Sequence, residues 1–182
     1  MFFRIVGGLM IGLFLVLGHS AMVLAAEECQ PVGEKKVKIE AWISKKFKKD
    51  KRAILKEFRE INDAKIAMRV FPMGDPNKVI AIGRCVPVDI AQQAIEKALK
   101  YAGGIKSLVN QRVIPPHWIA IGTTAFDQYS ERKVSEEQVA KLQDASLTTE
   151  GFQSLYGEYS KLSKLSTGFG LKVPNPRIPD EQ

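Results

Sequence analysis

Hydrophobic and polar residues alternate regularly near position 40. Over residues 37–43 every second position is apolar, which is typical of a strand with one buried face. Apolar residues at helical spacing follow over 54–61, and Asp50 stands where it could cap this helix. Several of these positions also fit one face of a single helix over about 40–62, so that helix is the competing interpretation.

The next part of the chain predicts two strands and a helix. Two β-rich runs, at 65–71 and 78–85, surround a dense cluster of turn formers at 72–77. Two strands around such a loop are typical of a hairpin. Apolar residues at helical spacing then begin after Pro87 and stop at the glycine pair 103–104, so we expect an amphipathic helix between them.

The C-terminal part continues with shorter patterns. Residues 105–114 fit one or two helical turns, and 117–126 are apolar and β-branched enough for a central strand. Two further helices are predicted at about 135–143 and 148–162. Three prolines lie in the tail after 163, which we expect to be extended and flexible.

The order of these elements predicts the fold class. A β-α-β-β-α-β series over about 37–126 is typical of the ferredoxin-like split βαβ arrangement, an α+β fold in which two helices cover one face of a four-stranded antiparallel sheet. We therefore expect an α+β domain at 27–130, a small helical appendage at 131–163 and a flexible tail at 164–182.

The first 26 residues have the pattern of a secretory signal peptide. A basic residue precedes an apolar run over 5–18, and small residues around Ala25 and Ala26 suit signal peptidase. The run is shorter than the roughly 20 residues of a membrane span, although an uncleaved anchor is the alternative. The acidic pair before Cys29 argues against lipid attachment there. We expect a periplasmic or secreted protein without a transmembrane span after cleavage near Ala25 or Ala26.

Composition excludes several classes of protein. Of the 182 residues, 45% are hydrophobic and 26% are charged, as in ordinary globular domains and unlike disordered chains. Two cysteines cannot build a four-thiolate zinc site or an iron–sulfur cluster. His117 is the single histidine after the predicted signal. No metal or cofactor is therefore predicted.

The net charge of +7 comes from one segment. Residues 35–52 contain nine basic and two acidic residues, while the rest of the chain is nearly balanced. Because nucleic acid is not expected outside the cytoplasm, we expect an envelope protein or an anionic envelope surface, of lipid or polysaccharide, as partner. A solvated, lysine-rich helix start is the alternative. The predicted binding surface consists of Trp42, Lys45, Lys46, Lys48, Lys49, Lys51 and Arg52.

The two cysteines are predicted to form a disulfide. In a split βαβ sheet the first and third strands are antiparallel neighbours, so Cys29, before the first strand, would lie near Cys85, at the end of the third. Closing a loop of this length would stabilise the fold by about 4 kcal/mol in the loop-entropy model.

A catalytic role for Cys85 is the competing hypothesis. A thiol between a strand and a helix N-terminus has a lowered pKa, and His117 could act as its base with Asp127 or Asp89 orienting the imidazole. That arrangement would make a thiol-dependent hydrolase. Nothing in the sequence brings His117 to Cys85, so we favour a non-enzymatic binding or accessory (adaptor) protein of the cell envelope, with the hydrolase as alternative.

Overall fold

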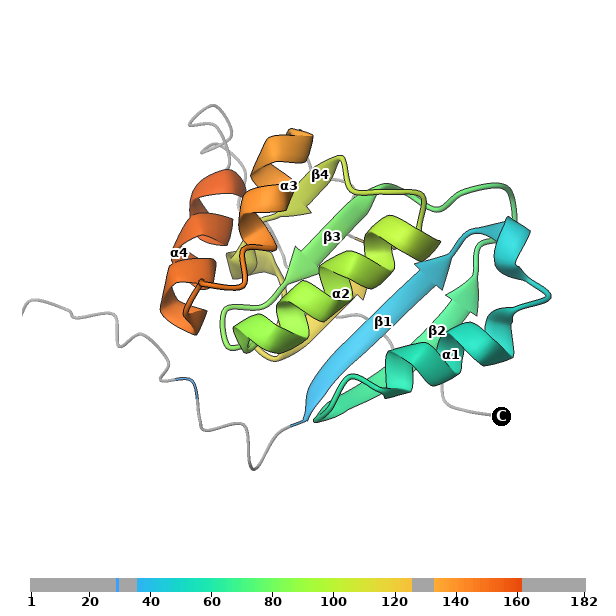
Figure 1. The fold of residues 1–182 in the computed structure, drawn as a ribbon. Helices are drawn as coiled ribbons and strands as arrows, with labels where there is room; N and C mark the ends of the chain where they lie inside the picture. Colours follow the sequence, from blue (N-terminus) through green and yellow to red (C-terminus); the bar gives the residue numbers. More distant parts are fainter. Residues whose placement is uncertain (1–28, 30–35, 126–132, 162–182) are drawn as a thin grey trace, which may run out of the picture.

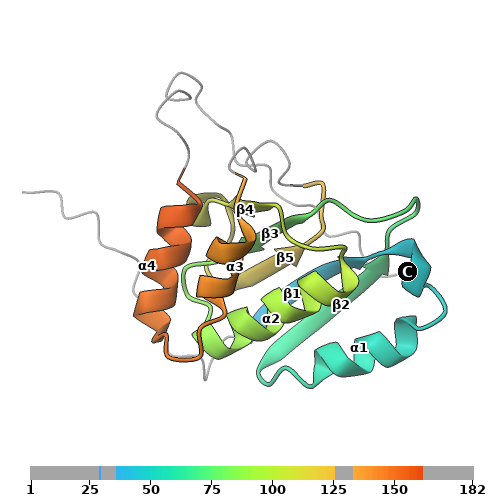
Figure 2. The ribbon, with the colours of Figure 1, turned by 45° about the horizontal axis from the view of Figure 1, so that its top comes forward.

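Five strands form one mixed sheet in the order β2-β1-β5-β3-β4 (Figures 1 and 2; β5 is labelled in Figure 2). This is seen in a computed structural model that describes residues 29, 36–125 and 133–161. Strands β2, β1 and β5 run parallel to one another, β3 runs antiparallel to β5, and β4 is parallel to β3. The strands are β1 (Val37–Ile43), β2 (Ala64–Val70), β3 (Val79–Ile82), β4 (Ser107–Val109) and β5 (Trp118–Ile121).

The α-helices gather on one face of this sheet (Figures 1 and 2). Two of them connect neighbouring parallel strands: α1 joins β1 to β2, and α2 joins β3 to β4. Right-handed crossovers of these two units place both helices on the same face. The helices are α1 (Lys51–Arg59), α2 (Val88–Tyr101), α3 (Glu136–Leu142) and α4 (Thr149–Tyr159), with short 3-10 helices η1 (Lys45–Phe47) and η2 (Gln111–Val113).

The main core lies between the sheet and these helices. Every second residue of β1 is buried there, as the alternation over 37–43 predicts, so the single long helix over 40–62 is wrong. Helices α3 and α4, expected as an appendage, contribute to the same core through Val139, Leu142, Phe152 and Tyr156. A smaller cluster on the opposite face packs Ile114 against β3, β4 and β5.

Tyr156 connects α4 to the sheet. Its side chain is completely buried, and its hydroxyl accepts a hydrogen bond from the backbone N–H of Ile82 at 3.1 Å. The same hydroxyl lies 3.1 Å from the carbonyl oxygens of Ile80 and Val109, to which it can donate. One side chain therefore satisfies backbone groups of both β3 and β4.

The α+β class is as predicted, but the topology is not the ferredoxin-like split βαβ arrangement. The sheet has five strands rather than four and is mixed rather than antiparallel. The predicted hairpin is wrong, because β1 and β5 lie between β2 and β3. Residues 107–109, expected within helical turns, form β4. A three-residue strand is too short to show a period, so the local pattern could not reveal it.

The loop between β2 and β3 crosses the ends of β1 and β5 instead of closing a hairpin. Phe71 N–H donates to the carbonyl of Ile43 at 2.9 Å at the start of this crossing. Farther on, the loop passes over Gly122, where a Cβ would lie 2.9 Å from Cβ of Pro76 and from the carbonyl oxygen of Trp42. Gly122 also has a φ of 67°, so glycine provides both the conformation and the space for the crossing.

Candidate functional site

Cys29 and Cys85 form the predicted disulfide, with an S–S distance of 2.04 Å and a Cα–Cα distance of 5.2 Å. The bond links the segment before β1 to the turn between β3 and α2. This turn is held in place by the N–H of Cys85, which donates to the carbonyl of Pro116 at 2.9 Å. At Gly83 a Cβ would meet the same carbonyl oxygen at 2.3 Å, so the chain can approach this closely only at a glycine.

The disulfide also bears on the catalytic hypothesis. The sulfur of Cys85 is bonded to Cys29, so in this form it offers no thiolate for nucleophilic attack. The backbone contact to Pro116 brings Cys85 near the neighbour of His117, but no hydrogen bond joins the two side chains among the described residues. Asp127 lies outside the described residues, and Asp89 is exposed at the start of α2.

A group of cations lies where η1 leads into α1. We define this Lys-rich corner as Lys45, Lys46, Lys48, Lys49, Lys51 and Arg52. Five of these side chains are exposed and Lys51 is half-buried. Within the described part of the chain, none of the six lies within ion-pairing distance of a carboxylate. The prediction from the sequence thus names residues that are adjacent in the fold and carry positive charge into solvent.

The N-terminus of α1 adds to the positive potential of the Lys-rich corner. Asp50 is the N-cap residue of α1, as predicted, but its side chain makes no capping hydrogen bond, and no acidic residue follows in the first turn. Lys51 and Arg52 therefore stand at the positive end of the helix dipole, where cations are unfavourable. The corner is consequently a place where an anion would relieve repulsion.

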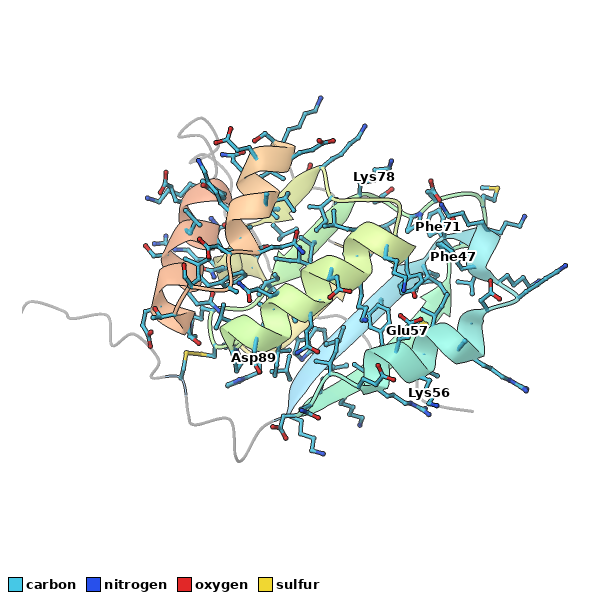
Figure 3. The ribbon with its side chains drawn as sticks, in the orientation of Figure 1. Phe47, Lys56, Glu57, Phe71, Lys78 and Asp89 are labelled. Atoms are coloured by element: carbon cyan, nitrogen blue, oxygen red, sulfur yellow. A yellow bond between two sulfur atoms is a disulfide. The ribbon has the colours of Figure 1, made fainter. Side chains whose placement is uncertain are left out.

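Glu57 forms ion pairs with two lysines of α2, Lys97 and Lys100. Figure 3 labels Glu57 on α1. Its carboxylate accepts hydrogen bonds from the Tyr101 hydroxyl at 2.6 Å and from Lys100 at 3.1 Å, and lies 3.7 Å from Lys97. The hydrogen bonds from Tyr101 and Lys100 lower the pKa of Glu57. Burial and the hydrogen bond to Glu57 raise the pKa of Tyr101, which therefore stays neutral. This cluster ties α1 to α2.

Trp42 lies on the face of β1 that points away from the core, as the alternation over 37–43 predicts, but it is less exposed than a binding residue on that face would be. It is half-buried on the side of the sheet opposite the helices, and it contacts Phe71 edge-on at a centroid distance of 6.1 Å. The guanidinium of Arg69 lies 5.6 Å from the centre of its ring. The ring of Trp42 therefore packs against Phe71 and Arg69 rather than standing alone among the lysines.

The loop after β2 is the part of this region that sequence reasoning missed. Its turn-forming residues predicted a connection and nothing more, yet Met73 in the loop is 79% exposed. The N–H of Lys45 donates to the carbonyl of Gly74 at 2.9 Å, so the loop adjoins the Lys-rich corner. Figure 3 shows Phe71 of this loop and Phe47 of η1 at the same end of the molecule.

A groove lies on the described surface between η2 and α4. Its charged lining residues have both signs: Arg112, Glu158 and Lys161. The groove therefore does not extend the positively charged surface.

The described residues contain neither a membrane-spanning helix nor a metal-binding cluster. No helix there is both long and apolar enough to pass through a bilayer. In the same residues, no three side chains of the types that bind metals come together.

Comparison of the chain with models of protein families, with curated proteins and with solved structures finds no match. The interpretation of the site therefore depends on its own chemistry.

Proposed function

We propose that this protein is a secreted or periplasmic, non-enzymatic accessory protein of the cell envelope, which binds an anionic envelope component through the Lys-rich corner. The observation that carries the proposal is the group of six cations at η1 and α1, for which the described residues provide no ion-pair partner. Elsewhere on the helix layer, Lys97 and Lys100 do pair with a carboxylate. The contrast supports an external anion as the missing partner of the corner.

The proposed compartment agrees with the rest of the chain. The disulfide suits an oxidising environment, and the first 26 residues have the signal-peptide pattern. In such a compartment the candidate anions are lipid headgroups, acidic polysaccharides and acidic proteins. Because lysine dominates over arginine in the corner, we expect binding by charge rather than by paired, directional hydrogen bonds.

Retention on immobilised dextran sulfate tests the proposal. We expect the protein to bind at low salt and K48Q/K49Q to elute at clearly lower salt, because these exposed lysines would no longer contact the polyanion. The slope of the logarithm of the binding constant against the logarithm of the salt concentration should become smaller by about two when two contacts are lost.

The double variant K106Q/K133Q is the matched control. Lys106 and Lys133 are exposed and lie beside β4, at the opposite edge of the sheet from β2. Because two lysines are again replaced by glutamine, this variant has the same net charge as K48Q/K49Q. It should elute nearly with the unmodified protein. Elution of both variants at the same salt would mean that only net charge matters, and it would overturn the proposed surface.

A further inference from the structure

The tip of the β2–β3 loop presents an apolar side chain beside the Lys-rich corner. Met73 and Leu99 are the two large hydrophobic residues that are exposed in the described chain, at 79% and 40%. Pro72, next to Met73, is also exposed, and Phe71 is half-buried. Most of the Met73 side chain is in contact with solvent, so it is accessible to a partner.

Hydrogen bonds fix this loop relative to the lysines. The carbonyl oxygen of Gly74 accepts a hydrogen bond from the N–H of Lys45 at 2.9 Å and lies 3.5 Å from the hydroxyl of Ser44. Gly74 has a φ of 72°, which allows the chain to turn sharply just after Met73. Met73 is thus held next to η1 by backbone contacts that do not involve its own side chain.

The one acidic residue of the loop does not interrupt this arrangement. The carboxyl group of Asp75 lies against Gly103 in the connection after α2, where a Cβ at Gly103 would be 3.1 Å from the carboxyl carbon. The cations of η1 therefore remain next to the exposed part of the loop, at Pro72 and Met73.

We propose that this end of the molecule docks on an anionic lipid bilayer, with Met73 entering the headgroup region and the Lys-rich corner contacting lipid phosphates. The inference rests on the proposed function and names its partner. An apolar tip beside a group of cations has the two features of interfacial binding, because apolar burial and attraction to anionic lipids act together there. A polysaccharide would match the cations but leave Met73 without a role.

Vesicle co-sedimentation separates the two contributions. The probe is phosphatidylcholine vesicles with about one-third phosphatidylglycerol, compared with pure phosphatidylcholine. We expect binding only to the anionic vesicles, and M73S should bind about tenfold more weakly. The control L99S removes the other exposed apolar side chain, on α2, and should bind as the unmodified protein does.

A label at the same position tests insertion directly. Because both cysteines of the described chain are in the disulfide, M73C and L99C each add one thiol for a polarity-sensitive dye under non-reducing conditions. The dye at position 73 should shift to the blue on anionic vesicles, and the dye at position 99 should not.

The outcomes separate this inference from the proposed function. If the vesicles bind through the lysines but M73S is unimpaired and no dye shifts, the lipid-insertion inference is overturned and binding by charge stands. Lysine-dependent retention on dextran sulfate without any vesicle binding also overturns it, in favour of a polysaccharide or protein partner. If K48Q/K49Q and K106Q/K133Q behave alike on both probes, the proposed function itself fails.

Discussion

Removal of the Tyr156 hydroxyl should destabilise the fold far more than the loss of one oxygen atom suggests. In Y156F the aromatic ring still fills its site in the core, so the transfer of apolar surface is preserved. The N–H of Ile82 loses its acceptor, and the carbonyls of Ile80 and Val109 lose a donor. All of these groups remain buried, because the site is completely enclosed.

The magnitude follows from the number of groups left without partners. One unsatisfied buried N–H costs about 1–3 kcal/mol, and the carbonyl that receives the single hydroxyl proton adds about 1 kcal/mol. Y156F is therefore expected to lose about 2–4 kcal/mol of unfolding free energy, a large part of the 5–15 kcal/mol that is ordinary for a domain. Burial raises the pKa of Tyr156, so the hydroxyl remains protonated and able to donate throughout the measurement.

Urea unfolding followed by circular dichroism, with the disulfide intact, measures this loss. The midpoint should fall while the denaturant slope stays constant. Y159F is the matched control, since Tyr159 is also buried on α4 and no hydrogen bond from its hydroxyl is seen within the described chain. It should change stability by less than about 1 kcal/mol. Equal losses in the two variants would refute the assignment of three backbone groups to Tyr156.

Two further predictions concern the disulfide and Glu57. Reduction, or the double variant C29S/C85S, should lower the unfolding free energy by up to about 4 kcal/mol for a sequence separation of 56 residues; unchanged urea midpoints with and without reductant would contradict this. The folded protein lowers the pKa of Glu57 below its ordinary value of 4.5. The ionised carboxylate therefore stabilises the fold at any pH above 4.5, and this stabilisation is lost as the pH falls through the lowered pKa. E57Q should thus be less stable than the unmodified protein at pH 7 by at most about 1 kcal/mol, since the pair is partly exposed, and the difference in melting temperature should vanish in acid.

The sequence predicted those strands and helices that have a buried and an exposed side. Strand β1 alternates because one of its faces meets the core and the other does not, and α2 shows the helical period for the same reason. Strand β3 is buried at all four positions. Its continuous apolar residues therefore predict a strand, but they do not show which strands pair with it. Pairing is decided by contacts between distant segments, and β5 enters the sheet between β1 and β3 from far along the chain.

The disulfide was predicted correctly from a topology that is partly wrong. The pairing requires only that the start of the first strand and the end of the third lie at one end of the sheet. Strand β5 separates β1 from β3, yet β3 still runs opposite to β1, so that condition holds. Cys29 reaches Cys85 because strand direction, rather than direct pairing, sets which ends lie together.

The sequence shows where the positively charged residues lie along the chain, but it does not show which of them form ion pairs. Counting residues located the Lys-rich corner. The ion pairs of Lys97 and Lys100 with Glu57, however, form only because α1 packs beside α2. The hydroxyl of Tyr156 likewise has no signature in the sequence, since its partners lie 47 to 76 positions away. Sequence reasoning thus identified which side chains carry charge, and the fold determines which of them remain without a partner.

The error in topology and the candidate membrane site have one cause. In a split βαβ domain the loop at 72–77 would close a hairpin between adjacent strands. Here β1 and β5 lie between those strands, so the loop must cross over their ends, and this route brings Gly74 to Lys45 and Met73 to the Lys-rich corner. A longer, freely moving loop could make the same crossing without a contact to η1. The hydrogen bonds of Gly74 therefore distinguish a fixed apolar tip from a simple connection, and G74A, which disfavours the turn at positive φ, should weaken vesicle binding even though no side chain at the surface is removed.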